Sequence, residues 1–588
     1  WDEFTQFQKK LQSILDDTFL VVFVHNLSYE FQFLRGIYLF EPEEVFAVRS
    51  RKVLKCDMYN CFEFRCSYLH SNMNLDTYTK KMGVQHKKLT GTFDYDKVRY
   101  PWTELTEQEL AYCIHDVQGL TEAIQIEMEH DGDNLYTFPL TSTGYVRRDA
   151  KKAMSEVSYN FVKGQLPDYE IYKMLREAFR GGNTHANRYY ANYTLHNVHS
   201  ADRSSSYPDV MCNCKFPVSE FYRLGDVTFD EVIKMLGKRQ KACIMRVAIT
   251  GAHLQRVDWG CPYLSLAKCR HVENALLDNG RIVSADYLET TITDIDLKIL
   301  LSEYAWTDMK FYDVATARYG YLPKPLIKTI CQYYHNKTEL KNVDDQDSLY
   351  GMCAQDPVKQ SILFIDNDFK EQNEDEAGLL LAYNRKAFLA YQWGVWVTAW
   401  ARYRLEEGIR LAHGDPDDPN APQFVYCDTD SVKYLGEINL DKFNRERIKD
   451  SRNSGAYATD PAGITHYMGV YEKEHDMCEF RTMGAKKYVY RETPDSKLIC
   501  TIAGVEKKKG GEELEAHGGI TAFHEGFTFV KAGGLEAIYN DLPAYDARDY
   551  EAEGRTCKIT ANVCLRPSTY TLGLTADYKR LLTEIRYE

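Results

Sequence analysis

The chain has 588 residues, too many for one hydrophobic core, so we expect roughly three to five domains. Its formal net charge of −14 by itself disfavours a nucleic-acid binder, although basic clusters begin at positions 87, 147, 485 and 505. The 16 cysteines include no CxxC pair, which disfavours a zinc finger and favours reduced thiols. The longest apolar run, residues 18–24, is too short to span a membrane, and no signal peptide is visible.

Residues 1–150 have an α/β pattern. Hydrophobic spacing predicts a helix over 4–15, a buried strand over 18–24, a further helix from Tyr29 and another over 107–128.

The rest of the chain alternates between strand-rich and helical stretches. Residues 183–260 are rich in strand formers, and residues 294–341 are helical in pattern. After an acidic loop, residues 391–412 predict an apolar helix whose C-terminal half is too polar for a membrane. Residues 424–434 predict a β-hairpin, and a mixed region interrupted by glycine follows. We find no internal repeat.

Two aspartates, Asp428 and Asp430, lie at the tip of the predicted hairpin. At i and i+2 on a strand they would share one face and repel each other unless a positive partner lies between them. A lone DxD is more often a surface turn or a single cation site. Here a third aspartate, Asp202, ends another predicted strand ahead of Tyr207 and Pro208. Three aspartates from two adjacent strands can hold two Mg²⁺ ions for phosphoryl transfer.

Four motifs, in this order, resemble those of family B DNA polymerases. "DRSSSYP" from Asp202 is similar to motif A, "DSLYGMCA" from Asp347 to motif B, "YCDTDS" from Tyr426 to motif C, and "KKY" from Lys486 to the KxY motif. "HNLSYEF", "FRGG" and "GVWVTAWAR" are similar to the protein-primed branch of small tailed phages, adenoviruses and linear plasmids. The resemblance covers nearly the whole chain. It implies an α+β multidomain fold: a right-hand polymerase (palm, fingers, thumb) with an N-terminal RNase H-like (DnaQ-type) α/β exonuclease domain.

The resemblance also implies roles in DNA synthesis. Asp202 and Asp430 would hold two Mg²⁺ ions, or Mn²⁺, with Asp428 in support. Tyr207 would lie under the incoming sugar and exclude a 2′-hydroxyl. The other implied contacts are Tyr350 on the nascent base pair, Lys337 near the triphosphate, Lys486 and Tyr488 at the primer end, and Phe179, Arg180, Gly181 and Gly182 along the template. Taken without the resemblance, Tyr207 and Tyr350 are core tyrosines and Lys337 is a solvated lysine.

A second set of motifs resembles the 3′–5′ exonuclease attached to these polymerases. "HNLSYEF" supplies Asn26 and Glu30, and "YCIHD" supplies Tyr112 and Asp116. The resemblance implies Mg²⁺ ligation by Glu30 and Asp116 and a water oriented by Tyr112. Ser71, in "SNMNL", would belong to a strand-binding element.

Two departures from the family pattern stand out. The exonuclease's first motif, Asp-x-Glu on a first strand, has no counterpart here. We therefore expect a poorly held metal, poor proofreading and an unpaired apolar edge at residues 18–24. In motif B, Val343 and Asp347 replace the family's Lys and Asn. We expect residues to be missing before Trp1 and between Lys341 and Asp347.

The resemblance implies a division into seven parts and a set of partners. The partners are primer–template DNA, dNTPs and a terminal protein that acts as primer. We expect a monomer in the cytoplasm of the host cell, bacterial for a phage protein, without membrane contact. The parts are 1–150 exonuclease-like, 151–217 palm with motif A, 218–312 and 356–388 insertions resembling terminal-protein regions 1 and 2, 313–355 fingers with motif B, 389–515 palm with motif C and KxY, and 516–588 thumb.

The leading hypothesis is a DNA-dependent DNA polymerase that is protein-primed and displaces the downstream strand. One alternative is a family B polymerase that starts without a primer. Another is a catalytically impaired DNA-binding component of a replisome, which the altered motif B favours and the intact aspartates disfavour. A reverse transcriptase is disfavoured because its hairpin tip usually reads YxDD.

Overall fold

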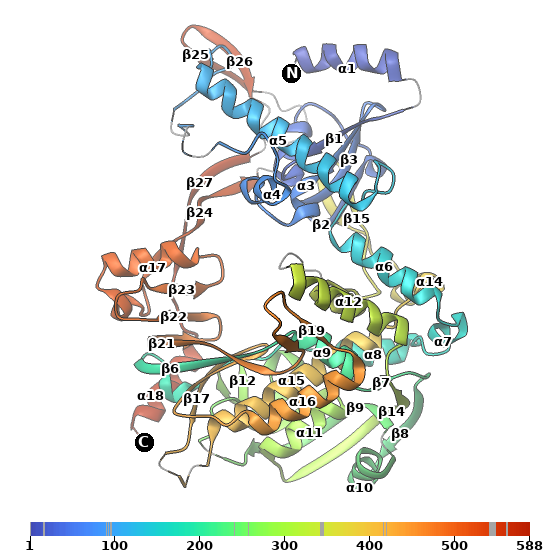
Figure 1. Ribbon diagram of the computed structural model, residues 1–588, viewed down its shortest axis with the longest axis vertical. Coiled ribbons are helices and arrows are strands. Elements are labelled where there is room, and N and C mark those ends of the chain that lie inside the picture. Colours follow the sequence, from blue (N-terminus) through green and yellow to red (C-terminus); the bar gives the residue numbers. More distant parts are fainter. Residues whose placement is uncertain are drawn as a thin grey trace. The chain divides into compact units, whose positions relative to one another are not determined.

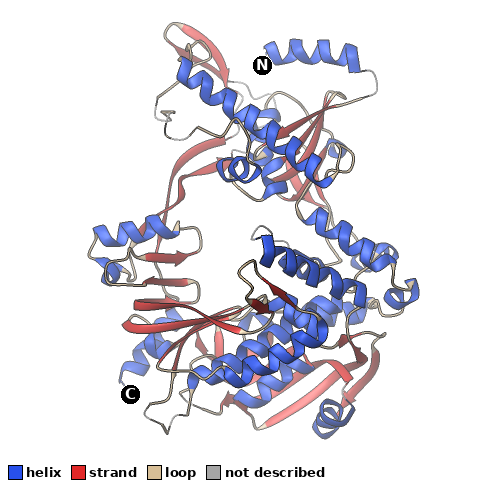
Figure 2. Cartoon of the chain, viewed as in Figure 1, coloured by secondary structure: helices blue, strands red, loops and turns tan. Residues whose placement is uncertain are grey.

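The computed structural model describes most of the chain (Figures 1 and 2). The described residues divide into two units. The N-terminal unit comprises Trp1–Arg148, Lys359–Glu376 and Glu536–Arg566, and the larger unit comprises Asp149–Val358, Ala377–Leu535 and Pro567–Glu588. No helix among the described residues is long and apolar enough to cross a membrane. The described ranges are 2–15, 18–89, 91, 93–94, 97–239, 241–256, 258–340, 346–415, 417–418, 420–539, 548–559 and 563–587.

A four-stranded sheet in the order β1-β4-β3-β2 forms the centre of the N-terminal unit. β1 (Leu20–Val24) runs parallel to β4 (Phe62–Cys66), while β3 (Lys52–Met58) lies antiparallel to both β4 and β2 (Val45–Arg49). The expectation that residues 18–24 form an unpaired edge is therefore wrong, because every residue of β1 pairs with β4. The partner strand comes from later in the chain, which the local pattern could not show.

Helices cover this sheet. Phe4 of α1 stacks on Phe62 of β4 with ring centroids 5.3 Å apart. The long helix α5 starts with a capping box between Thr106 and Glu109 and stops at Gly132, whose φ of 68° is left-handed. The helices of this unit are α1 (Asp2–Leu15), α2 (Leu27–Leu34), α3 (Ser67–Ser71), α4 (Leu75–Met82) and α5 (Glu107–Asp131); α6 (Thr143–Ser155) contains the boundary.

The segment Lys359–Glu376 belongs to the N-terminal unit, although the sequence predicted it within a separate insertion. It forms a hairpin of β15 (Ile362–Ile365) and β16 (Asp368–Glu371). Phe364 is buried, and its ring centroid lies 5.1 Å from that of Phe31. Burial of such rings contributes about 2–3 kcal/mol each, so the hairpin is part of this core. A second hairpin of the unit pairs β25 (Arg548–Ala552) with β26 (Arg555–Ile559).

A seven-stranded antiparallel sheet in the larger unit has the order β23-β22-β21-β6-β18-β17-β5. Its strands β23, β22, β21 and β6 can be followed in Figure 1. The apolar helix predicted over 391–412 is α15 (Tyr391–His413), and its Trp393 and Trp396 are fully buried. The strands are β5 (Thr184–Ala186), β6 (Thr194–Arg203), β17 (Gln423–Asp428), β18 (Ser431–Leu435), β21 (Tyr471–Gly484), β22 (Lys487–Arg491) and β23 (Ile499–Ile502).

A second sheet of eight strands is built around β9 and follows the path β10-β12-β9-β14-β7. Val247 of β9, Leu405 of α15 and Val432 of β18 belong to one buried cluster, so this sheet and the hairpin β17–β18 share a core. The strands are β7 (Phe216–Pro217), β8 (Tyr222–Val227), β9 (Lys241–Leu254), β10 (Cys269–Glu273), β11 (Leu276–Asp278), β12 (Arg281–Thr293), β13 (Tyr304–Ala305) and β14 (Asp308–Gly320).

The remaining elements of the larger unit are mainly helices. One short sheet pairs β19 (Tyr457–Thr459) with β20 (Thr465–Tyr467). Another pairs β24 (Thr528–Tyr539) with β27 (Val563–Thr571), and the boundary with the N-terminal unit falls within both of these strands. The helices are α7 (Tyr159–Lys163), α8 (Tyr169–Ala178), α9 (Ser206–Asn213), α10 (Phe229–Lys234), α11 (Asp294–Glu303), α12 (Lys324–Leu340), α13 (Gln346–Cys353), α14 (Glu376–Lys386), α16 (Asp441–Ser454), α17 (Lys507–Ala516) and α18 (Ala576–Tyr587). The predicted interruption between Lys341 and Asp347 falls largely on residues outside those described.

Candidate active site

The pairing of two strands brings the predicted aspartates together. β6 and β18 are antiparallel neighbours, with Asp202 opposite Ser431. β17 ends at Asp428, and Thr429 and Asp430 form the turn into β18. Asp202, Asp428 and Asp430 therefore meet at one end of the seven-stranded sheet.

The hairpin tip has a strained backbone. The N–H of Asp430 donates to the carbonyl of Asp428 at 2.6 Å, and Thr429 between them has a φ of 61°. These are features of a classic γ-turn, and a positive φ is unusual for a β-branched residue. Asp430 thus lies in the turn rather than on a strand. The predicted reason for both carboxylates facing one side, strand alternation, does not apply.

The FRGG segment braces this tip. A Cβ at Gly182 would lie 2.7 Å from the Thr429 hydroxyl oxygen, whereas a Cβ at Gly181 would meet open space. The N–H of Thr429 donates to the carbonyl of Asn183 at 2.7 Å. We expected both glycines to admit a DNA strand. At Gly182 the group that needs the room is the threonine of the protein's own hairpin.

A cavity of about 280 Å³ opens where the aspartates meet. It contains all three predicted aspartates and also Glu474, a carboxylate that the sequence reasoning missed. Glu474 lies where β21 slips in register against β6, between Lys473 and Asp476. Bulges of this kind re-aim side chains next to active sites. The lining residues are Asp202, Asp428, Thr429, Asp430, Ser431, Lys433, Glu474, His475, Tyr488, Tyr490, Thr501 and Lys507.

The cavity is strongly negative. Burial, and then the charge of Glu474, raise the pKa of Asp202 to about 6. A carboxylate in this environment is costly to ionise without a cation. The electrostatics therefore favour a positive ligand at Asp202.

Lys486 and Asp428 form an ion pair at the mouth of the cavity. The Lys486 ammonium lies 2.6 Å from both carboxylate oxygens of Asp428, and the Thr184 hydroxyl donates to one of them at 2.8 Å. The backbone N–H of Lys486 donates to the Tyr426 hydroxyl at 2.9 Å, and the Tyr426 ring lies 4.9 Å from that of Tyr488. The KxY residues thus adjoin the aspartates, as predicted.

Tyr207 and Tyr350 also come together. Their rings stack with centroids 4.1 Å apart and an interplanar angle of 16°. Tyr334 of α12 is a neighbour of Ser204, in the turn of motif A: burial raises the pKa of Tyr334, and Ser204 lowers it. Lys337 follows one turn later on α12 and is exposed. The residues predicted to contact the nucleotide therefore lie on elements joined to motif A.

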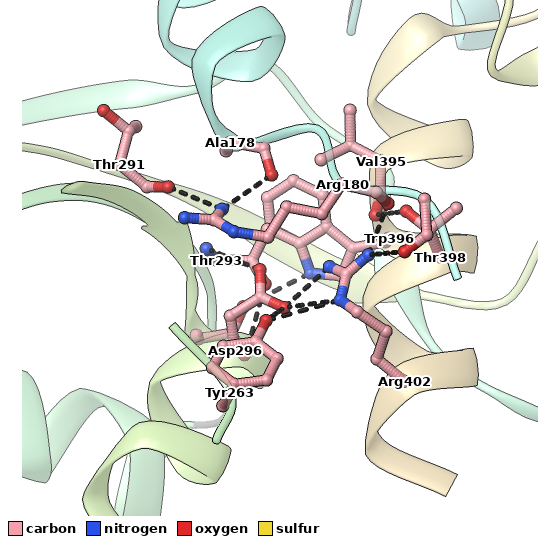
Figure 3. A network of polar contacts seen from close by, with 12 residues as sticks. Ala178, Arg180, Tyr263, Thr291, Thr293, Asp296, Val395, Trp396, Thr398 and Arg402 are labelled. Carbon is pink, nitrogen blue, oxygen red and sulfur yellow. Dashed lines mark hydrogen bonds and ion pairs between the residues drawn. The ribbon is translucent and has the colours of Figure 1, made fainter. Parts of the chain in front are cut away.

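Arg180 is buried, which corrects the expected direct contact with DNA. It is 8% exposed and donates to the carbonyls of Ala178 and Thr291 at 2.9 and 2.8 Å. Arg402 of α15 donates to Asp296 at 2.7 Å (Figure 3) and to the Gly181 carbonyl at 3.0 Å. These arginines hold the FRGG segment in place rather than offering charge to a phosphate. Phe179, which ends α8, is half-buried.

The donor set suits Mg²⁺, which prefers carboxylate oxygens. Among the described residues, no three His, Cys, Asp or Glu side chains already lie close enough to hold an ion. The Asp428 carboxylate is engaged by Lys486. The raised pKa of Asp202 and the four carboxylates in one cavity nevertheless fit a divalent cation.

Two of the predicted exonuclease residues, Tyr112 and Asp116, form a second polar cluster with Lys88 in the N-terminal unit. The Lys88 ammonium donates to the Tyr112 hydroxyl at 2.8 Å and to Asp116 at 2.7 Å. The other oxygen of Asp116 is buried without a hydrogen-bond partner. Lys88, which the sequence offered only as part of a basic cluster, is thus the central cation here.

The motif HNLSYEF, which supplies Asn26 and Glu30, is less clearly part of this cluster. Asn26 is the N-cap residue of α2 and has a left-handed conformation with φ of 79°, and burial raises the pKa of Glu30. The charge of Asp116 raises the pKa of His25, although burial lowers it more, so Asp116 and His25 are neighbours. Ser71 is 9% exposed and donates to the Ser67 carbonyl in its own helix, which corrects its expected contact with a DNA strand.

The fold and the cavity define the class of this protein. It is a right-hand polymerase fold with an RNase H-like N-terminal domain. The chain belongs to the DNA polymerases of type B, organellar and viral, whose family model matches residues 45–381.

Relatives in sequence and in structure agree with this membership. The DNA polymerase of Bacillus phage B103 is 24% identical over 417 residues, which cover 66% of this chain and 64% of that protein. The phi29 DNA polymerase is 21% identical over 406 residues, covering 66% and 64%. The aligned region thus spans less than two thirds of these relatives. The structure of phi29 DNA polymerase complexed with primer-template DNA superposes with a TM-score of 0.68 at 18% identity, covering 97% of this chain and 93% of that one.

Proposed function

We propose that this protein is a DNA-dependent DNA polymerase that extends a primer from dNTPs on a template. The observation that carries the proposal is the cavity in which Asp202, Asp428 and Asp430 meet beside Lys486 and Tyr488. Family membership and the polymerase fold support it.

The residues of the cavity suit nucleotidyl transfer. The primer 3′-oxygen forms a bond to the α-phosphorus of the dNTP, and the bond to pyrophosphate breaks. Bound Mg²⁺ would neutralise charge on the attacking and leaving oxygens. Asp202 and Asp430 would hold two such ions, with Asp428 in support. The Lys486 side chain is 55% exposed to solvent and would offer its ammonium to the primer phosphate, and Tyr207 and Tyr350 would separate to admit the nucleotide.

The test is primer extension with Mg²⁺ and dNTPs on a short hybrid. Asp430→Ala should extend at least about 100-fold more slowly, because several kcal/mol of charge stabilisation is lost. The matched control is Asp308→Ala, which removes an exposed carboxylate of β14. An extension rate of Asp430→Ala within about tenfold of the parent rate would contradict the two-metal assignment.

We further propose that synthesis is protein-primed and displaces the downstream strand, in the cytoplasm of a bacterial host. The similarity to polymerases of Bacillus phages supports this. A terminal protein should be needed for initiation on an unprimed linear template. Synthesis from naked template without it would favour the primer-independent alternative, and DNA binding without any extension would favour the impaired replisome component.

For the N-terminal unit we propose an incomplete 3′–5′ exonuclease. Glu30 and Asp116 are the carboxylates that its motifs supply. A site of this kind needs carboxylates from three motifs to hold both Mg²⁺ ions, and one loosely held ion cannot both activate water and neutralise the leaving oxygen.

A further inference from the structure

Lys433 is a buried residue in the lining of the catalytic cavity. It is 4% exposed, and strand pairing sets it opposite Ser200. Its ammonium donates to the Ser200 hydroxyl at 3.3 Å, and that hydroxyl donates to Glu474 at 3.0 Å. The ammonium also lies over the Tyr488 ring, 5.7 Å from its centroid. This lysine is fixed in place and is too enclosed to receive a phosphate.

The surroundings of Lys433 are acidic. Glu474, Asp202 and Asp428 all act on its charge and raise its pKa, although burial lowers it more. In return, the charge of Lys433 lowers the pKa of Asp202. A buried ammonium is stable only with such partners, and carboxylates this close repel one another without a cation.

We propose that Lys433 is a positioning residue, an internal cation that balances the carboxylates of the cavity before Mg²⁺ binds and so keeps them in place. The inference rests on the proposed polymerase function, because it takes these carboxylates to be the metal site. Lys433 holds Glu474 through Ser200, and its charge weakens the repulsion among the aspartates.

The proposal makes a prediction about stability with and without metal. Lys433→Met keeps a long apolar side chain but removes the charge. The metal-free protein should then melt about 2–4 °C lower than the parent, since the carboxylates repel one another unopposed. The more negative cavity should bind Mg²⁺ more tightly, and ligand binding to the folded state raises Tm. The Tm gain from EDTA to excess Mg²⁺ should therefore be larger in Lys433→Met than in the parent.

A charge-balanced double variant separates charge from packing. Lys433→Met with Glu474→Gln removes one charge of each sign and leaves an oxygen that can accept from Ser200. Its Tm in EDTA should return toward the parent value. The control is Lys310→Met, which removes an exposed lysine of β14 and should change neither Tm nor the Mg²⁺ response.

Three outcomes would overturn the proposal. An equal loss of Tm in EDTA and in Mg²⁺ would show that Lys433 only packs. If the Tm of the double variant in EDTA does not return toward the parent value, charge balance is not the role of Lys433. The same conclusion holds if neither Lys433→Met nor the double variant folds. A parent protein that shows no Mg²⁺ response and no extension would overturn the proposed function and this inference together. A parent that responds to Mg²⁺, with a variant that does not differ from it, would overturn the inference alone.

Discussion

Tyr207 and Tyr350 come from motifs far apart in the sequence, yet their rings stack 4.1 Å apart. Stacked rings contribute about 0.5–1.5 kcal/mol beyond their burial, so separating the two rings costs a modest amount of free energy. In the polymerase that we propose, the stack would have to open for a nucleotide to lie beside Tyr207.

We predict that Tyr207 excludes ribonucleotides by its bulk. Tyr207→Val should incorporate rNTPs more readily while keeping most dNTP activity, because the smaller side chain leaves room for a 2′-hydroxyl. The measurement is the ratio of rNTP to dNTP incorporation, with Tyr222→Val, at a 72% exposed position, as control. An unchanged ratio would make Tyr207 a core tyrosine and the motif A alignment wrong.

A buried acidic pair gives the larger unit a pH-dependent stability. Burial, and then the charge of Glu406, raise the pKa of Glu303 well above its ordinary value. The folded protein therefore holds this proton where the unfolded chain has released it. Stability from this group is present at low pH and falls as pH rises above about 4.5 toward the folded pKa.

Glu303→Gln should remove that loss. Relative to the parent, the variant should gain in free energy of unfolding between about pH 5 and pH 8, as measured by urea denaturation. Glu220→Gln, at an exposed position, should show no such trend. A pH-independent difference for Glu303→Gln would mean that Glu303 is ionised in the folded protein.

For the cluster around Asp116 we predict weak digestion of a 3′-labelled single strand in Mg²⁺ without dNTPs. Lys88 already neutralises Asp116, and the third carboxylate motif is absent from the sequence. Asp131→Ala, on the same helix, is the control for Asp116→Ala. Robust degradation that disappears only in Asp116→Ala would show that residues we did not recognise complete the site.

At the scale of elements, the FRGG segment and the β17–β18 hairpin act as one piece. Gly182→Ala should displace Thr429, because the added Cβ would overlap its side chain; overpacking of this kind costs about 1–3 kcal/mol. Primer extension should fall at least about tenfold as the aspartates shift. Gly181→Ala is the matched control, since its Cβ meets open space. Equal activity of the two variants would contradict the brace.

The elements also show which residues of the candidate site could be predicted from the sequence. The order of motifs predicted the meeting of Asp202 with Asp428 and Asp430, because each motif carries its own signal. Glu474 carries none: it reaches the cavity through a slip in the pairing of β21 with β6, and such a register depends on a strand more than 250 residues away. The prediction that Arg180 contacts the template was wrong for the opposite reason. The motif FRGG carries a signal, through its resemblance to the family's template-binding segment, but only tertiary packing shows that Arg180 is buried.

At the scale of the whole molecule, the net charge does not predict the charge near the cavity. The total is −14, yet Lys507 lines the catalytic cavity and Lys486 is half-exposed beside it. Lys487 is not equally available, since its ammonium donates to the Gly573 carbonyl at 2.7 Å.

We therefore predict that DNA affinity depends on salt despite the acidic total. Each phosphate contact should contribute a slope of about −0.9 to the plot of log K against log salt. Fluorescence anisotropy with a labelled primer–template between low and physiological salt measures it. A flat curve would count against a basic DNA path.

The N-terminal unit is assembled from three separated stretches of chain, and this determines when the unit can finish folding during synthesis on the ribosome. Residues near the start meet partners near the end: the Trp102 indole donates to Glu553 at 3.0 Å, and the guanidinium of Arg555 lies over the Trp102 ring. The ring of Phe31 likewise packs against that of Phe364, which is translated more than 300 residues later. Domains usually fold in the order in which they emerge. Here the stretch Trp1–Arg148 is translated before the larger unit, yet its own unit is completed only once Glu536–Arg566 has been made, and its apolar surface stays open to chaperones or to aggregation until then.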